Sequence, residues 1–173
     1  MISLLSMLLL TQVASSPSLG VAEGRCRAGE SGPAFMVGID GLRDRTGWIK
    51  VEVYPANDQD FLADDNLLIN AGKTFRRVEV AVPPSGRPQI CVRVPRAGVY
   101  AVSILHDRNR DHRFSLTQDG VGFAGNPHLG LSRPSAAAAS ARAGEGLTAI
   151  GVTMNYRHGM FGFGPLAPAQ TSR

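Results

Sequence analysis

Five consecutive residues near the middle of the chain carry the side chains with which a calcium-binding loop begins. Asp107, Asn109 and Asp111 stand two residues apart, separated by single arginines. Oxygen side chains at loop positions one, three and five can converge on one hard cation, because their arms are short and the spacing places them on the same side. With Asp119 further along, they form the candidate metal site, and calcium is the cofactor that such a site would take.

Other residues of the segment count against calcium. Position six is His112, where a sharp turn favours glycine, and position twelve is Gln118, where a calcium loop has a bidentate glutamate. The interleaved Arg108 and Arg110 also place positive charge among the ligands. In the alternative interpretation, Asp107, Asn109 and Asp111 accept hydrogen bonds from the backbone and hold a long loop.

His106 and Asp107 are the candidate catalytic pair, since a histidine oriented by a carboxylate can act as a general base. Neighbouring residues of a strand point to opposite faces, which argues against direct contact between the two. The sequence also has no Gly-x-Ser-x-Gly nucleophile motif. We therefore predict no catalytic residue and expect His106 to bond loop carbonyls. A small periplasmic hydrolase that uses His106, Asp107 and Asp111 is the alternative.

Residues 1–22 resemble a secretory signal peptide. The apolar run Leu4–Leu10 is shorter than the roughly 20 residues that span a bilayer. Small residues at Gly20 and Ala22 suit a peptidase that cuts after Ala22, although no basic residue precedes Leu4. The pattern predicts a periplasmic or secreted protein without a transmembrane segment in the mature chain. Alternatively, this segment is the first strand or helix of the domain.

The two cysteines, Cys26 and Cys91, follow the predicted cleavage site. In an oxidising compartment an even pair of cysteines indicates a disulfide. Such a bond would tie the start of the mature chain to a strand far along the sequence. The alternative is a pair of buried free thiols.

Alternating apolar side chains predict the fold. The stretches are short and are separated by Gly- and Pro-rich turns, at residues 34–39, 46–54, 75–82, 89–94, 99–105 and 147–156. The stretch 99–105 is apolar on both faces, which predicts a central, covered strand. We expect an all-β, antiparallel sandwich of about seven strands, immunoglobulin-like or transthyretin-like. It would form a single domain over residues 23–165, followed by a frayed tail at residues 166–173.

Composition excludes several classes of protein. Hydrophobic residues make up 43% of the chain and charged residues 18%, which excludes a disordered chain. The net charge is +4, but the basic residues are scattered, so we expect no nucleic-acid partner. Arg76, Arg77, Arg93 and Arg96 are a candidate basic patch for an acidic protein or a lipid headgroup. The alternative is that they pair with Glu52 and Glu79 across the strands.

The segment from Pro95 to Asp111 resembles a known bacterial family. It consists of a turn, then Gly98-Val-Tyr-Ala-Val102, then a buried strand that ends in His106-Asp-Arg-Asn-Arg-Asp111. This pattern is similar to domain of unknown function 2141, in the form found in exported proteins of alphaproteobacteria. The resemblance covers Phe35 to Tyr156. It implies a secreted or periplasmic sandwich and no established activity.

The sequence thus predicts an exported, non-catalytic binding or scaffolding module of the bacterial cell envelope. Its partner would be an envelope protein or a surface ligand, met by the loop between Asp107 and Pro127, since loops on a rigid sandwich usually carry function. A calcium-dependent envelope module that uses the Asp107–Asp111 loop is the first alternative.

Overall fold

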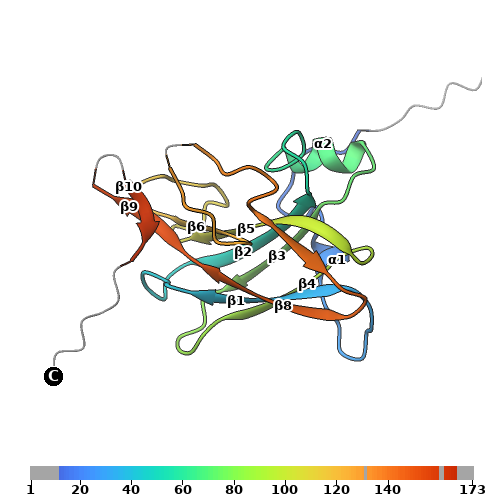
Figure 1. The fold of residues 1–173 in the computed structure, drawn as a ribbon, viewed down its shortest axis with the longest axis horizontal. Coiled ribbons are helices and arrows are strands. Elements are labelled where there is room, and N and C mark those ends of the chain that lie inside the picture. Colours follow the sequence, from blue (N-terminus) through green and yellow to red (C-terminus); the bar gives the residue numbers. More distant parts are fainter. Residues whose placement is uncertain (1–11, 131, 160–161, 167–173) are drawn as a thin grey trace, which may run out of the picture.

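The computed structural model describes residues 12–130, 132–159 and 162–166. Ten strands in these residues form two sheets (Figure 1). The strands are β1 (Ala34–Asp40), β2 (Trp48–Pro55), β3 (Arg76–Ala81), β4 (Gln89–Arg93), β5 (Gly98–Asp107), β6 (Gly120–Phe123), β7 (Ser140–Ala143), β8 (Leu147–Thr153), β9 (Asn155–His158) and β10 (Gly162–Pro165). Two short helices are α1 (Val21–Gly24) and α2 (Asp65–Asn70).

The order of the strands defines a smaller and a larger sheet. The small sheet has the order β4-β1-β8, and the large sheet has the order β10-β9-β6-β5-β2-β3, with β7 also paired to β5. The predicted all-β sandwich is confirmed, whereas its immunoglobulin-like topology stays a prediction. Strands of only four residues, such as β7, β9 and β10, raise the number above the expected seven. They are too short to show an alternating pattern.

One pair of strands departs from the antiparallel expectation. β1 and β8 run parallel, in a register that places Val37 beside Ile150, whereas the other described pairings are antiparallel. The chain then leaves the small sheet at the buried Met154, whose N–H donates to the Asp40 carbonyl at 2.9 Å, and continues as β9 in the large sheet. The sequence predicts one strand over 147–156 because alternation persists across the crossing.

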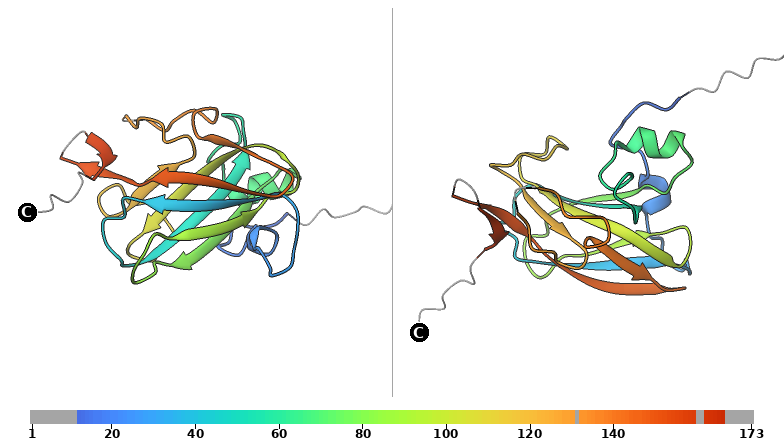
Figure 2. Two further views of the ribbon diagram at one scale, coloured as in Figure 1. Left: turned by 60° about the horizontal axis from the view of Figure 1, so that its bottom comes forward. Right: turned by 45° about the horizontal axis from the view of Figure 1, so that its top comes forward.

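The large sheet is covered on both faces. Its inner face packs on the small sheet through buried apolar residues, among them Val51, Val102 and Ile104. Its outer face carries a second apolar cluster, which includes Tyr54, Phe61, Leu68, Phe75, Ala101 and Phe123. β5 is buried from Tyr100 to Asp107, so the prediction of a central, covered strand is confirmed. Figures 1 and 2 place α2 and β10 at opposite ends of the molecule.

The described part of the predicted signal peptide packs on the edge of the large sheet. Leu19 contacts the second apolar cluster, and the Gly20 carbonyl accepts a hydrogen bond from the Arg77 N–H at 3.1 Å. A Cβ at Gly20 would lie 2.9 Å from the Phe75 ring, so this close approach requires glycine. Helix α1 spans the predicted cleavage point after Ala22, as in the alternative interpretation of this segment.

Two of the predicted segments lie mainly outside the residues that the structure describes. The apolar run Leu4–Leu10 and residues 167–173 lie outside the described residues, and cleavage after Ala22 stays a prediction. Among the described residues, no helix is both long and apolar enough to cross a membrane.

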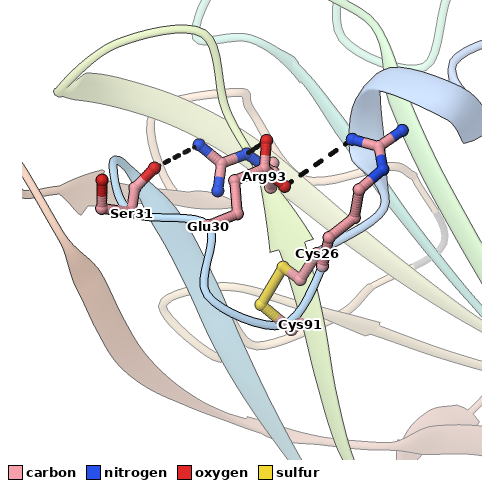
Figure 3. The surroundings of a disulfide bond; sticks show 6 residues. Cys26, Glu30, Ser31, Cys91 and Arg93 are labelled. Atoms are coloured by element: carbon pink, nitrogen blue, oxygen red, sulfur yellow. Dashed lines mark hydrogen bonds and ion pairs between the residues drawn. A yellow bond between two sulfur atoms is a disulfide. The ribbon is translucent and has the colours of Figure 1, made fainter.

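The predicted disulfide is present between Cys26 and Cys91, which are 65 residues apart in sequence. Figure 3 shows how it joins the segment before β1 to β4. Beside it, the Arg93 guanidinium donates to the Ser31 carbonyl at 2.8 Å and lies 3.4 Å from the Glu30 carboxylate. Closing so long a loop stabilises a fold by about 3–5 kcal/mol in the chain-entropy model.

Candidate functional site

Asp107 organises the loop that follows β5, residues 107–119, which we call the acidic loop. Its carboxylate is fully buried and accepts N–H bonds from three residues of the loop. Oδ1 lies 2.7 Å from the Arg110 nitrogen and 3.3 Å from the Asp111 nitrogen, and Oδ2 lies 2.8 Å from the His112 nitrogen. Both oxygens of Asp107 are therefore occupied by the backbone.

Asp119 closes the other end of the acidic loop. Its carboxylate is almost fully buried and accepts the Arg108 N–H at 2.9 Å and the Ser115 N–H at 2.7 Å. Between the two buried aspartates, Asn109 Nδ2 donates to Asp111 Oδ2 at 2.7 Å. Hydrogen bonds from the Arg113 N–H and from Asn109 lower the pKa of Asp111.

The structure thus brings all four predicted metal ligands into one loop with their oxygens bonded to protein donors. These contacts match the alternative interpretation, in which the side chains hold the loop. No group of three or more His, Cys, Asp or Glu side chains within the described residues is placed to hold a metal ion. The alternative prediction of a calcium-dependent module stays a prediction, and these hydrogen bonds argue against it.

The sharp turn that His112 was expected to disfavour does form. Arg110 has a φ of 63° and His112 a φ of 61°, both in the left-handed region. The three backbone hydrogen bonds to Asp107 hold this conformation. The His112 ring also lies 5.1 Å from the Trp48 ring and 3.2 Å from the Glu79 carboxylate, so packing fixes it from the side.

His106 is buried and hydrogen-bonds a loop carbonyl, as predicted. Nε2 lies 2.8 Å from the Thr46 carbonyl and therefore carries the proton, while Nδ1 accepts from the Tyr156 hydroxyl at 2.7 Å. The same hydroxyl accepts the Arg43 N–H at 3.0 Å. Burial lowers the pKa of His106 below its ordinary value. Its side chain points to the face opposite that of its neighbour Asp107, so the two form no catalytic pair.

A pocket lies elsewhere, on the outer face of the large sheet. It has a volume of about 420 Å³, within the usual range of small-ligand sites. Three adjacent strands make its floor in two rows of paired residues. Lys50, Leu105 and Val121 form one row, and Glu52, Ser103 and Phe123 form the other.

The walls of this outer-face pocket come from segments far apart in the sequence. Phe114 and Leu116 extend from the acidic loop, and both side chains are about half exposed. The Phe163 ring on β10 lies 6.3 Å from the Phe114 ring and continues this wall. The remaining wall residues are Leu62, Leu129, Gly130, Ser132, Arg133 and Pro134.

Charged side chains on β2 and β3 underlie one side of the pocket. Glu52 Oε1 accepts from Arg77 Nε at 2.8 Å, and Glu52 Oε2 accepts from the Tyr54 hydroxyl at 2.8 Å. Burial and the nearby Glu52 carboxylate raise the pKa of Tyr54 well above its ordinary value, which keeps this hydroxyl a donor. Lys50 Nζ donates to the His112 carbonyl at 3.1 Å and lies 3.6 Å from Glu52 Oε1.

The predicted basic patch does not gather in one place. Arg77 pairs with Glu52 across the strands, as in the alternative interpretation, and also with Asp65 at 3.2 Å. Arg93 lies beside the disulfide on the small sheet. The arginine that does reach the pocket is Arg133, whose guanidinium donates to the Phe61 and Asp58 carbonyls.

Sequence reasoning missed the pocket, although one signal was available. Lys50 and Glu52 alternate with Val51 and Val53 in the sequence, which indicates that they lie on the other face of their strand. The neighbouring strand 99–105 is apolar on both faces, so the outward face of the same sheet had to be covered. The two observations together predict that Lys50 and Glu52 lie on a covered face of the sheet. Charged side chains among covering apolar residues are typical of a ligand pocket.

A family model matches residues 37–150, and its description is an uncharacterized protein conserved in bacteria, DUF2141. The chain belongs to this family. The DUF2141 match contains β2 to β7 whole, and with them the acidic loop and the pocket floor. Phe163 and Cys26 lie outside it. Comparison with curated proteins and with solved structures gives no match.

Proposed function

We propose that this protein is an exported, non-catalytic binding module of the bacterial cell envelope, and that the outer-face pocket is its binding site. The pocket itself carries the proposal. A sheet floor with apolar walls and a few polar side chains is the usual construction of a small-molecule site. The half-exposed Phe114 and Leu116 at its wall would lose contact with water when a ligand enters.

Two further observations support the other parts of the proposal. The disulfide supports export, because such bonds persist in oxidising compartments. The contacts of His106 support a non-catalytic role, because both of its ring nitrogens are taken by Thr46 and Tyr156.

A neutral fluorescent probe, N-phenyl-1-naphthylamine, tests whether the pocket binds apolar molecules. We expect the oxidised full chain to increase the fluorescence of the probe in a saturable titration. Gly130 lines the pocket, and a Cβ there would meet open space, so Gly130→Phe is chosen to place a ring at the pocket wall. This variant should weaken binding at least fivefold.

Gly146→Phe is the matched control for this titration. A Cβ at Gly146 would also meet open space, and this residue does not line the pocket. An unchanged titration is expected for the control. The proposed function is wrong if the native chain does not bind the probe, or if both variants weaken it equally.

Export is tested separately by fractionating cells of a Gram-negative host that express the full chain. We expect the protein in the periplasmic fraction, with both cysteines protected from alkylation until a reductant is added. Protein found only in the cytoplasm with two alkylated cysteines would contradict this part of the proposal.

A further inference from the structure

We propose that the ligand of the outer-face pocket is a single apolar chain with a carboxylate head group, and that Lys50 binds the carboxylate. This inference rests on the proposed function and specifies the chemistry of the same site. It follows from the one-sided polarity of the pocket, from the hydrogen bonds that Lys50 lacks, and from the state of the neighbouring Glu52.

The polarity of the floor changes across the strands. β2 contributes the charged Lys50 and Glu52, whereas β6 contributes Val121 and Phe123. Beyond β6, Phe163 adds further apolar surface. A molecule lying across the floor would meet charge at one end and hydrocarbon along the rest. That arrangement fits an amphipathic molecule with one polar end.

Lys50 has capacity for another partner. The residue is 8% exposed, and its ammonium group carries three N–H donors. One donates to the His112 carbonyl at 3.1 Å. The contact with Glu52 Oε1, at 3.6 Å, is longer than a charge-assisted hydrogen bond. A buried ammonium group is stabilised by close anionic partners, and Glu52 supplies this stabilisation only in part. An entering carboxylate would supply the rest.

Glu52 does not compete for the polar end of a ligand. Arg77 holds Oε1 through both Nε and Nη2 at 2.8 Å, and the Tyr54 hydroxyl occupies Oε2. The Arg77 guanidinium therefore offsets the charge of Glu52 from the adjacent strand β3. A cationic head group would meet a carboxylate that Arg77 already pairs, whereas an anionic one meets Lys50.

The rim of the pocket carries positive charge, as Lys50 does in the floor. Arg133 lines the pocket and donates to two backbone carbonyls, those of Phe61 and Asp58. Carbonyls accept its hydrogen bonds without neutralising its charge. The charged side chains that line the pocket are thus two cations, Lys50 and Arg133, and one anion, Glu52. This excess favours the entry of anions.

Isothermal titration calorimetry of the oxidised full chain tests the head group. The three probes are decanoate, decan-1-ol and decyltrimethylammonium, each below the concentration at which it forms micelles. We expect decanoate to bind at least tenfold more tightly than either of the others. Lys50→Met should weaken decanoate binding at least tenfold and change decanol binding less than twofold.

Lys73→Met is the matched control, since Lys73 is the other lysine of the chain and pairs with Asp60 outside the pocket. It should bind decanoate as the native chain does. If Lys50→Met does not fold, Lys50→Gln is measured instead, with the same expectation.

The outcomes separate the two proposals. Equal affinity for decanoate and decanol, or decanoate binding that survives the loss of Lys50, would overturn the carboxylate assignment while probe binding upholds the pocket. If none of the three decyl probes binds and N-phenyl-1-naphthylamine does not bind either, both the assignment and the proposed function are wrong.

Discussion

The acidic loop and the floor of the outer-face pocket are neighbouring clusters of polar side chains with opposite states of bonding. In the acidic loop, Asp107 and Asp119 are buried and every carboxylate oxygen accepts at least one backbone N–H. In the pocket floor, Lys50 is also largely buried, at 8% exposure, but within the described residues it makes one hydrogen bond and one longer ionic contact. The protein itself satisfies the hydrogen bonds of the buried aspartates, whereas the Lys50 ammonium group keeps capacity for a further partner.

The difference teaches where to look for function in an acidic, calcium-like sequence. A carboxylate whose oxygens are occupied by its own loop contributes to stability, because unmaking those bonds leaves buried donors unpaired. A buried charge with spare donors is available to a ligand, whose acceptor groups can complete its hydrogen bonds. The density of charged residues in the sequence does not distinguish the two cases.

The largest effect is expected at Asp107. Asp107→Ala removes the acceptor of three backbone N–H groups, and we expect the free energy of unfolding to fall by about 3–5 kcal/mol. Urea denaturation monitored by circular dichroism measures it. Asp111→Ala is the control, since Asp111 is exposed, and little change is expected. If both variants lose the same free energy of unfolding, the buried carboxylate of Asp107 is not what stabilises the loop.

A pH dependence is expected from His106, the residue before the acidic loop. Burial lowers its pKa from 6.5, so the unfolded chain binds the proton more tightly than the folded chain. The free energy of unfolding should therefore be constant above about pH 6.5 and decline as the pH falls below it. Urea midpoints between pH 8 and pH 5 measure this decline.

His106→Gln should flatten that slope. A contribution from Asp44 falls in another range, because hydrogen bonds from Arg108 and Thr46 outweigh the effect of burial and lower its pKa to about 2. Its stabilising effect is lost only as the pH falls from 3.8 toward 2. An unchanged slope between pH 8 and pH 5 in His106→Gln would contradict the assignment.

A small effect on stability is expected at Lys50, despite its burial. In Lys50→Met, Glu52 keeps Arg77 and Tyr54, so no buried charge is left alone. We expect the free energy of unfolding to change by less than about 1 kcal/mol. Chemical denaturation of the variant measures it. If the free energy of unfolding falls as far as in Asp107→Ala, Lys50 stabilises the fold as Asp107 does.

No effect at all is expected from calcium. Because the oxygens of the acidic loop are already bonded, the melting temperature of the full chain should be the same in millimolar calcium and in EDTA. A saturated site would raise it by roughly 5–10 °C. A rise of that size, lost in Asp111→Ala, would show that the acidic loop is a binding site and would reverse the comparison.

Patterns within single segments predicted much of this molecule. Alternation predicted the sandwich strands, a stretch apolar on both faces predicted the covered position of β5, and the two cysteines predicted the disulfide. The pocket could not be predicted in the same way. Its walls come from Leu62, Leu116, Arg133 and Phe163, which lie in segments without periodicity, and only the folded chain brings them together.

The crossing at Met154 shows a second limit of such patterns. Ile150, Val152 and Met154 alternate as one continuous strand would, yet the chain changes sheets among them. Both sheets face the same core, so inward residues look alike on either side of the crossing.

The segment before Glu23 would link a cleavage of the chain to the floor of the pocket. Arg77, which holds Glu52 in place, also donates its Nη1 to the Ser16 carbonyl and its backbone N–H to the Gly20 carbonyl. A peptidase that cuts after Ala22 would detach both acceptors and leave Arg77 to its carboxylate partners. A cut further upstream would keep them. The position of one cleaved bond at the edge of β3 would thus decide how firmly the charges under the ligand are held.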